Sequence, residues 1–245
     1  MKTNSNTVLI TGGSSGIGLE LAKRFLQLNN RVIITGRDES KLARIKEAFP
    51  GIKTIPGDLT DQATLDRTIA DIEAHYPDLN ILINNAAVQF NYELKDEPDV
   101  FARIDYEVAA NLLVPVKLTA GLLPLLLKNP NSAVVNVSSG LFIAPKRSAS
   151  VYCATKAAMH SFSKTLRYQL EETNVQVFEI IPALTDTPMT RGRGKSKMTA
   201  GQLTDEFMRN FQRNRYESYI GKTKLLKRIS RLFPQLADRI MKNGL

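Results

Sequence analysis

Val8-Leu9-Ile10-Thr11-Gly12-Gly13-Ser14-Ser15-Gly16-Ile17-Gly18 is the stretch that decides the fold of this 245-residue chain. An apolar, β-prone run leads straight into a cluster of glycines, and a helical pattern of apolar residues follows it. Glycine suits such a turn because its backbone is permissive and because no Cβ keeps a pyrophosphate away from the peptide N–H groups. The helix N-terminus adds partial positive charge at the same place. The stretch therefore predicts a phosphate-binding turn between a strand and a helix, with a plain strand–helix turn as the alternative.

Outward from this stretch, short strand patterns alternate with longer helical patterns. The predicted strands are continuous apolar runs at Val8–Thr11, Val32–Thr35, Ile52–Ile55, Ile81–Ile83, Ala133–Val137 and Val175–Ile181. The predicted helices lie between them at Gly16–Leu28, Glu39–Ala48, Asp61–His75, Pro98–Leu127 and Ser150–Glu171. This alternation is typical of parallel βαβ units, and unbroken apolar strands are typical of a sheet covered on both faces. We therefore predict a single α/β domain over residues 1–245, a doubly wound parallel sheet of the Rossmann type in three α/β/α layers.

The positive charge of the chain is concentrated in two segments. The formal net charge is +9, and residues 222–245 hold seven Lys or Arg against Asp238 alone. Four more basic residues are grouped shortly before them, at Arg191, Arg193, Lys195 and Lys197. The first 190 residues are therefore nearly neutral. The sequence therefore gives no reason to expect a positively charged surface over the whole domain, and nucleic acid is not expected as a partner.

Cysteine usage and the N-terminal sequence favour a cytoplasmic location. Cys153 is the only cysteine, so no intramolecular disulfide can form, and a small buried side chain is a better interpretation of it than a nucleophile. Met1–Asn6 is too short and polar for a signal peptide, and no apolar run reaches the roughly 18 residues of a membrane span. His75 and His160 lack carboxylate or cysteine partners at ligand spacing, so no metal site is expected.

The sequence after Pro182 departs from the alternating pattern. Residues 186–220 are predicted to form a substrate loop region, with a mobile loop over 186–200, and residues 222–245 a basic amphipathic tail. Pro234 predicts that the tail forms two short helices. Its apolar residues at helical spacing are Leu225, Leu226, Ile229, Leu232, Phe233, Leu236 and Ile240. We favour packing of Leu225, Ile229, Leu232 and Leu236 on the domain or a partner subunit, with an anionic membrane surface as the alternative.

Arg37 indicates which dinucleotide the turn would bind. A fold that prefers NAD normally ends its second strand with an acidic residue that holds the ribose hydroxyls. Here the strand ends at Gly36, and Arg37 follows. A guanidinium suits a 2′-phosphate, so NADP(H) is the predicted cofactor and NAD(H) the alternative. A solvated arginine paired to Asp38 or Glu39 is the competing interpretation, and no second basic group is visible in the sequence.

Tyr152 and Lys156 are the candidate catalytic pair. They lie four residues apart at the head of a predicted helix, so the phenol and the ammonium share one face. A phenol has a pKa near 10, and we expect Lys156 and an oxidised nicotinamide to lower it. Ser139 follows the strand that ends at Val137. Because ligands of open α/β sheets bind beside such strand ends, Ser139 can hydrogen-bond the substrate oxygen.

With these residues the chain resembles the short-chain dehydrogenase/reductase family. The matching motifs follow the family's order and spacing from position 11 to 189: Thr11-Gly12-x-x-x-Gly16-x-Gly18, Asp58-Leu59, Asn84-Asn85-Ala86-Ala87, Asn111, Ser139, Tyr152-x-x-x-Lys156 and Pro182-Ala183-x-x-x-Thr187-x-Met189. The segment Ile34–Leu42 and the tail from Gly221 are similar to a bacterial branch associated with teichoic-acid D-alanylation genes.

The resemblance implies a role for each of these positions. Tyr152 would be the acid/base, Lys156 would lower its pKa and hold the nicotinamide ribose, Ser139 would orient the substrate, and Asn111 would support a water relay behind Lys156. The implied cofactor contacts are Gly12, Ser14, Ser15, Gly16, Ile17 and Gly18 in the turn, Arg37, Asp58 and Leu59 at the adenosine phosphate and adenine, Asn85 and Ala86 on the adenosine side, and Pro182, Leu184 and Thr187 at the nicotinamide end. Contact between the helices over 98–127 and 150–171 of two subunits would give a homodimer or homotetramer.

The chain departs from the family pattern at three places. Ala87 and Ala183 stand where glycine is usual, and each adds only a methyl group. The family's seventh strand is not recognisable, and Ser218–Gly221 is the only candidate for what remains of it.

Two functions from different classes remain open. The leading interpretation is a cytoplasmic oxidoreductase that transfers a hydride between NADP(H) and a small carbonyl or alcohol substrate, with peripheral membrane contact through the tail as a further hypothesis. The alternative is a catalytically idle NADP(H)-binding sensor or scaffold. The full set of Ser139, Tyr152, Lys156 and Asn111 argues against it, because a module that only binds nucleotide does not need Ser139.

Overall fold

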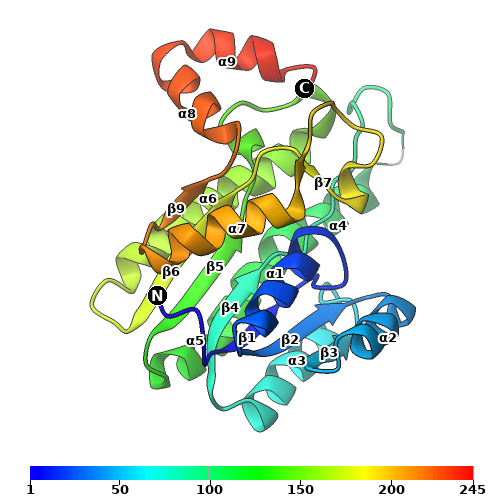
Figure 1. Cartoon of the computed structure of the whole chain (residues 1–245). Coiled ribbons are helices and arrows are strands. Elements are labelled where there is room, and N and C mark those ends of the chain that lie inside the picture. Colours follow the sequence, from blue (N-terminus) through cyan, green and yellow to red (C-terminus); the bar gives the residue numbers. More distant parts are fainter. Residues whose placement is uncertain (99, 245) are drawn as a thin grey trace.

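Seven parallel strands form the central sheet of the computed structural model (Figure 1). The structure describes residues 1–98 and 100–244; position 99, within the predicted 98–127 helix, and position 245, the last of the tail, lie outside the described residues. The strand order is β3-β2-β1-β4-β5-β6-β9. The strands are β1 (Thr7–Ile10), β2 (Arg31–Gly36), β3 (Ile52–Pro56), β4 (Leu79–Asn84), β5 (Ser132–Val137), β6 (Val175–Ile181) and β9 (Glu217–Tyr219). The predicted doubly wound parallel sheet is confirmed.

Helices cover both faces of the sheet, as the unbroken apolar strands predict. In β1, Val8 and Ile10 belong to one core cluster and Leu9 to the other, because successive side chains point to opposite faces. The first cluster takes in side chains of α1 (Gly16–Gln27), α2 (Glu39–Ala48) and α7 (Ala200–Gln212). The second takes in side chains of α3 (Gln62–His75), α5 (Val114–Lys128) and α6 (Ser150–Gln169). The result is the predicted three-layer arrangement.

The seventh strand, which the sequence analysis did not recognise, is present. β9 pairs in parallel with β6, with Glu179 opposite Glu217 and Ile181 opposite Tyr219. It is only three residues long and contains Glu217 and Ser218, so it carries no apolar run. The candidate Ser218–Gly221 overlaps this strand at Ser218 and Tyr219, so the seventh strand is present at that place, one residue earlier than proposed, and it completes the sheet.

The helix predicted over 98–127 begins at Phe101 and is continuous to Lys128. It consists of α4 (Phe101–Val108), a π-helical turn η1 (Ala109–Leu113) and α5. Within the described residues, this helix is the one that is long and apolar enough to cross a membrane, judged by length and composition alone. The sequence analysis did not expect such a helix, because charged residues interrupt its apolar run. Leu118, Leu122 and Leu126 in α5 are fully buried in the core. The helix is therefore a core element of the domain, and its apolar composition follows from that burial.

The segment predicted as a mobile loop contains short ordered elements. β7 (Thr185–Asp186) and β8 (Met198–Thr199) pair in parallel at its base, and a 3-10 turn, η4 (Pro188–Thr190), lies between them. Thr199 then caps α7 by accepting a hydrogen bond from the Gln202 N–H at 3.1 Å. This closed base directs the remaining loop over the carboxyl end of the sheet.

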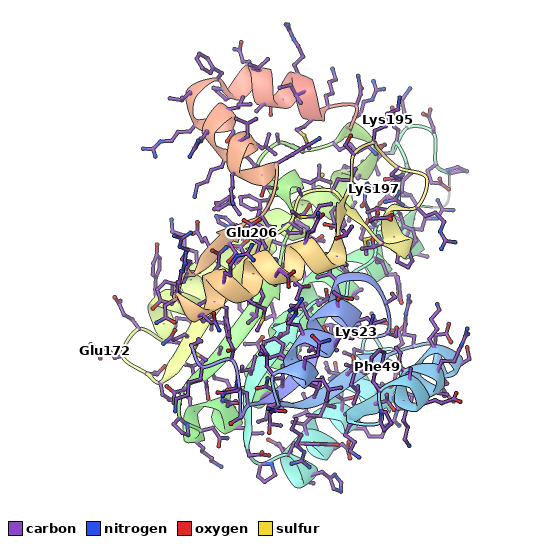
Figure 2. The ribbon with its side chains drawn as sticks, viewed as in Figure 1. Lys23, Phe49, Glu172, Lys195, Lys197 and Glu206 are labelled. Carbon is purple, nitrogen blue, oxygen red and sulfur yellow. The ribbon has the colours of Figure 1, made fainter. Side chains whose placement is uncertain are left out.

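The tail forms the two predicted helices, α8 (Thr223–Leu232) and α9 (Pro234–Met241), beyond the end of β9 (Figure 1). Leu226, Ile229, Ala237 and Met241 pack with Leu141 and Ala144. Glu206 of α7, labelled in Figure 2, pairs with Lys224 of α8. The prediction that the tail packs on the domain is thus confirmed for Ile229, but Leu225, Leu232 and Leu236 are 59%, 69% and 46% exposed in the single chain.

Candidate active site

The glycine turn lies at the carboxyl end of β1 and has no room for larger residues. Gly12 has a φ of +65°, and a Cβ there would lie 2.9 Å from the Ala86 Cα. A Cβ on Gly18 would lie 2.4 Å from the Asn85 amide nitrogen, so this glycine allows α1 to pack closely against the segment after β4. Ser15 is the N-cap of α1 and its side chain makes no capping hydrogen bond. The turn and the helix N-terminus therefore present free donors to the adjoining cleft.

Hydrogen bonds from the segment after β4 hold the turn in place. The Thr11 hydroxyl accepts from the backbone N–H groups of Asn85 and Ala86, each at 3.0 Å. The Asn85 side chain donates to the carbonyls of Thr11 at 2.9 Å and Gly12 at 3.2 Å. The Asn-Asn-Ala motif thus supports the turn as well as lining the cleft.

One cleft brings most of the predicted cofactor residues together. Those that line it are Gly12, Ser14, Ser15, Gly16, Ile17, Arg37, Asp58, Leu59, Asn85, Ala86, Tyr152, Lys156, Pro182 and Thr187. Gly18 and Leu184 are not among its lining residues: Gly18 packs behind the turn, and the Leu184 carbonyl accepts from the Met198 N–H at 3.1 Å. The cleft runs from Arg37 at one end to Tyr152 at the other, and its glycine cradle fits a dinucleotide.

Asp58, Tyr106 and Arg37 form a polar group at the first end. The Tyr106 hydroxyl donates to Asp58 Oδ2 at 2.7 Å, and the Arg37 guanidinium lies 3.6 Å from the same oxygen and contacts the Tyr106 hydroxyl. Burial would raise the pKa of Asp58, but hydrogen bonds from Thr60 and Tyr106 and the charge of Arg37 outweigh it and lower the pKa. Arg37 is therefore paired to Asp58 and Tyr106 in this structure, and neither to Asp38 nor to Glu39 as the competing interpretation had it.

Lys41 is a second basic group at this end, which sequence reasoning missed. A recess beside the cleft is lined by Ser14, Ser15, Arg37, Asp38 and Lys41. Asp38 caps α2 by accepting from the Lys41 N–H at 3.0 Å, and the Lys41 ammonium lies 3.0 Å from the other Asp38 oxygen. The i, i+4 spacing of Arg37 and Lys41 across the start of α2 was the available signal.

Tyr152 and Lys156 line the opposite end of the cleft, and Ser139 follows the lining residue Ser138 there without lining the cleft itself. Tyr152 and Lys156 lie on α6 and are only 7% and 3% exposed. The Lys156 ammonium donates to the Val137 carbonyl at 2.8 Å and lies 5.6 Å from the centre of the Tyr152 ring. Ser139 is the N-cap of the 3-10 turn η2 (Gly140–Phe142), where its hydroxyl accepts from the Leu141 N–H at 3.2 Å, and it lies near the Tyr152 phenol. The arrangement places a phenol, a hydroxyl and an ammonium beside the end of β5.

Burial favours the neutral forms of both titratable groups. It raises the pKa of the Tyr152 phenol to about 12, while the hydrogen bond from Ser139 and the charge of Arg193 act in the opposite direction. Burial also lowers the pKa of Lys156 to about 8. The expected lowering of the phenol pKa by Lys156 is therefore not what this structure shows, because desolvation of the phenol outweighs the nearby positive charge.

Asn111 lies in the π-helical turn η1, behind the catalytic pair. Its side chain accepts from the Val88 N–H and donates to the Val88 carbonyl, each at 2.8 Å, and also donates to Thr155 Oγ1 at 3.3 Å. It does not line the cleft. Asn111 thus links the segment after β4 to α6, and π-helical turns of this kind occur frequently at functional sites.

The histidines and the cysteine have structural partners. His160 stacks on Phe142 and its ring nitrogen lies 2.8 Å from a Glu179 oxygen, while exposed His75 pairs with Asp71. The expectation that they lack carboxylate partners is therefore wrong: Asp71 lies four residues before His75 on α3, and Glu179 reaches His160 from β6, 19 positions further along the chain. Cys153 is buried beside the Lys146 backbone, as expected. Within residues 1–98 and 100–244, no group of three or more His, Cys, Asp or Glu side chains could hold a metal ion.

Comparison with known proteins agrees with this geometry. The family model for short chain dehydrogenases matches residues 6–198. An uncharacterized oxidoreductase of Bacillus subtilis, DltE, is 44% identical over 213 residues, which are 86% of this chain and 84% of DltE. The short-chain dehydrogenase from Sphingobium yanoikuyae in complex with NADPH superposes with a TM-score of 0.80 at 25% identity, over 94% of this chain and 95% of that one. A short chain dehydrogenase from Burkholderia cenocepacia in complex with NADP shares the fold, with a TM-score of 0.87 at 22% identity over 99% and 100% of the two chains. The chain therefore belongs to the short-chain dehydrogenase family of oxidoreductases.

Proposed function

We propose that this oxidoreductase transfers a hydride between NADP(H) and a carbonyl or alcohol substrate, with Tyr152 as the acid/base. The observation that carries the proposal is the position of Tyr152 and Lys156 at one end of the cleft that the glycine turn opens. The bound nicotinamide supplies or accepts the hydride. In reduction the Tyr152 phenol donates its proton to the carbonyl oxygen, and in oxidation its phenolate takes the alcohol proton. With a pKa raised to about 12, the phenol is protonated at neutral pH and ready to act as the acid.

Ser139 and Lys156 assist this proton transfer in different ways. The Ser139 hydroxyl would hold the substrate oxygen next to the Tyr152 phenol, near which it lies. Lys156 would hold the nicotinamide ribose, and Asn111, which lies behind it, would support a water relay. The hydrogen bond from Lys156 to the Val137 carbonyl keeps the ammonium of Lys156 in position.

Arg37 and Lys41 support a preference for NADP(H) over NAD(H). Two basic side chains and two serines line the recess beside the end of β2, together with Asp38. The Asp38 carboxylate is engaged by the ammonium and the N–H of Lys41, and the strand end itself is Gly36, which offers no carboxylate. A phosphate monoester is recognised by such donors, whereas a ribose diol is recognised by an acidic side chain. NAD(H) is the alternative cofactor.

The idle sensor or scaffold is the second candidate, and turnover separates it from the enzyme. We expect the purified chain to oxidise NADPH in the presence of at least one member of a panel of aldehydes and ketones, or to reduce NADP⁺ with an alcohol, measured by nicotinamide absorbance. Tight NADP(H) binding with no turnover across the panel would support the sensor instead.

We propose a cytoplasmic homodimer or homotetramer. Leu113 at the end of η1, Leu127 on α5 and Tyr168 on α6 are 46%, 42% and 60% exposed. Large apolar side chains grouped on two neighbouring helices suit a helix-to-helix contact between subunits.

The tail supports a further proposal, peripheral contact with an anionic membrane. One row of apolar side chains on α8 and α9 faces away from the domain, at Leu225, Leu232, Phe233, Leu236 and Ile240, which are 39% to 69% exposed. Seven basic residues flank this row. An apolar row with basic flanks is the composition of a helix that lies in the surface of an anionic bilayer.

We expect the full chain to sediment with anionic but not with neutral vesicles, and salt to release it. Replacing Leu232 and Phe233 with serine should abolish sedimentation, whereas replacing exposed Leu113, which lies outside the tail, should not. A chain that never sediments with anionic vesicles would contradict the membrane contact, and a change of oligomeric state in the tail variant would assign this row to a subunit interface.

A further inference from the structure

Arg193 extends from the loop between β7 and β8 toward the catalytic end of the molecule. It is flanked by Gly192 and Gly194, which have φ values of +75° and +59°, a left-handed conformation that favours glycine. Its backbone N–H donates to the Thr190 carbonyl at 3.0 Å. Its Nη2 donates to the Gln89 carbonyl at 3.4 Å, across the gap to the segment after β4. The two glycines thus allow the loop to turn this side chain inward while Lys195 next to them stays exposed (Figure 2).

The Gln89 carbonyl is held where Arg193 can reach it. On either side of Gln89, Val88 is bonded to Asn111 and the Phe90 N–H donates to Glu107 Oε1 at 3.1 Å. These bonds fix the segment against α4 and η1. Gln89, which lies between these two bonded residues, has its carbonyl directed to the loop that carries Arg193 and accepts the hydrogen bond from it.

The guanidinium is left with an unused donor. Nη1 of Arg193 is buried and has no hydrogen-bond partner, and no Asp or Glu in the described part of the chain lies within ion-pair distance of it. Lys197 in the same loop pairs with Asp186 instead, and Glu107 bonds to Phe90. A buried guanidinium nitrogen without a partner is costly unless a ligand satisfies it.

The position of Arg193 assigns that ligand to the substrate. The hydrogen bond to Gln89 places the guanidinium next to Val88, which lines the cleft, and the charge of Arg193 acts to lower the pKa of the Tyr152 phenol. Arg193 does not line the dinucleotide cleft, whereas Thr187, Pro188 and Met189 of the same loop do. The unused donor therefore lies outside the dinucleotide cleft but beside segments whose residues line it, at Val88 and at Thr187 to Met189.

We propose that Arg193 binds an anionic oxygen group of the substrate, a carboxylate or a phosphate, and so selects acidic carbonyl or alcohol compounds. This inference rests on the proposed function, because it places the anion beside the carbon that reacts at Tyr152. The planar guanidinium provides Nη1 and the weakly bonded Nη2 for a bidentate contact.

The test compares matched charged and neutral probes: acetoacetate with its methyl ester, and dihydroxyacetone phosphate with dihydroxyacetone. Reduction with NADPH gives kcat/KM. Calorimetry on the protein loaded with NADP⁺ gives affinity without turnover, because no hydride can then be transferred to a ketone. The first pair reports on carboxylate and the second on phosphate.

We expect wild-type protein to favour the charged member of at least one pair, and Arg193→Gln to reduce that preference on the order of 10- to 100-fold, as loss of a hydrogen bond to a charged group does. Affinity for NADPH should be unchanged. Arg191→Gln, an exposed arginine two positions away, is the control and should retain the preference.

Two results overturn the inference: wild-type protein that binds charged and neutral probes equally, or an Arg193→Gln variant with the wild-type preference. Failure of the proposed function looks different. In that case no probe is reduced, while calorimetry still detects Arg193-dependent binding of the anion.

Discussion

Tyr152→Phe is expected to lower kcat by roughly 100- to 10,000-fold, the range that a positioned acid or base contributes. The phenyl ring keeps the packing of the buried Tyr152 side chain with Ala149, Cys153 and Leu141, so the fold should be retained. Only the hydroxyl that exchanges the proton is lost. The dissociation constant for NADPH should stay near the wild-type value, because the glycine turn, Arg37 and Lys156 are unchanged. Steady-state kinetics and NADPH fluorescence titration measure the two quantities.

Two further variants separate proton transfer from general damage to the site. Tyr76→Phe, in a half-buried position at the end of α3 and away from the cleft, should leave both quantities unchanged. Lys156→Ala should reduce turnover and NADPH affinity together, because its ammonium is expected to hold the cofactor as well. Residual activity of Tyr152→Phe within a few-fold of wild type would exclude Tyr152 as the acid/base.

The strands of the sheet were predictable because burial on both faces leaves a direct trace in the sequence. β1, β2, β4, β5 and β6 are runs of apolar residues with little interruption, and each predicted strand lies within two residues of the observed one. β9 escaped recognition because an edge strand of three residues, covered in part by its neighbours, needs no such run. Ser218 is nonetheless 1% exposed, so its burial comes from tertiary packing and not from local hydrophobicity.

The same difference between local sequence pattern and tertiary packing decides which site residues could be predicted. Tyr152 and Lys156 were predictable because a fixed spacing on one helix brings them together. Tyr106 and Arg193 were not predicted, because each reaches its partners across a long separation: Tyr106 to Asp58 over 48 positions and Arg193 to Gln89 over 104. No periodicity records such contacts. The raised pKa of Tyr152 was missed for a related reason, since desolvation depends on what packs around the ring.

Arg37→Ala is expected to weaken NADPH binding on the order of 10- to 100-fold while changing NADH binding little, because a charge-assisted hydrogen bond to the 2′-phosphate would be lost. The guanidinium is 57% exposed, and exposed ion pairs such as the one with Asp58 contribute only about 0–1 kcal/mol. Arg37 can therefore exchange Asp58 for a phosphate at little cost. Removing Lys41 as well should enlarge the loss, since both side chains line the recess beside Ser14 and Ser15.

The control for this prediction is Arg44→Ala, because Arg44 lies on α2 with Lys41 but bonds to Ser40 and does not line the recess. Its affinities for both dinucleotides should match wild type. Gly36→Asp should act in the opposite direction and favour NADH, although a Cβ at Gly36 would lie 3.2 Å from both Leu42 and Ser14, so these neighbours must shift by a few tenths of an ångström. Circular dichroism and thermal unfolding check that this variant remains folded. Equal losses of NADPH and NADH affinity in Arg37→Ala would show that the guanidinium never meets the 2′-phosphate, and the preference for NADP(H) would then need another source.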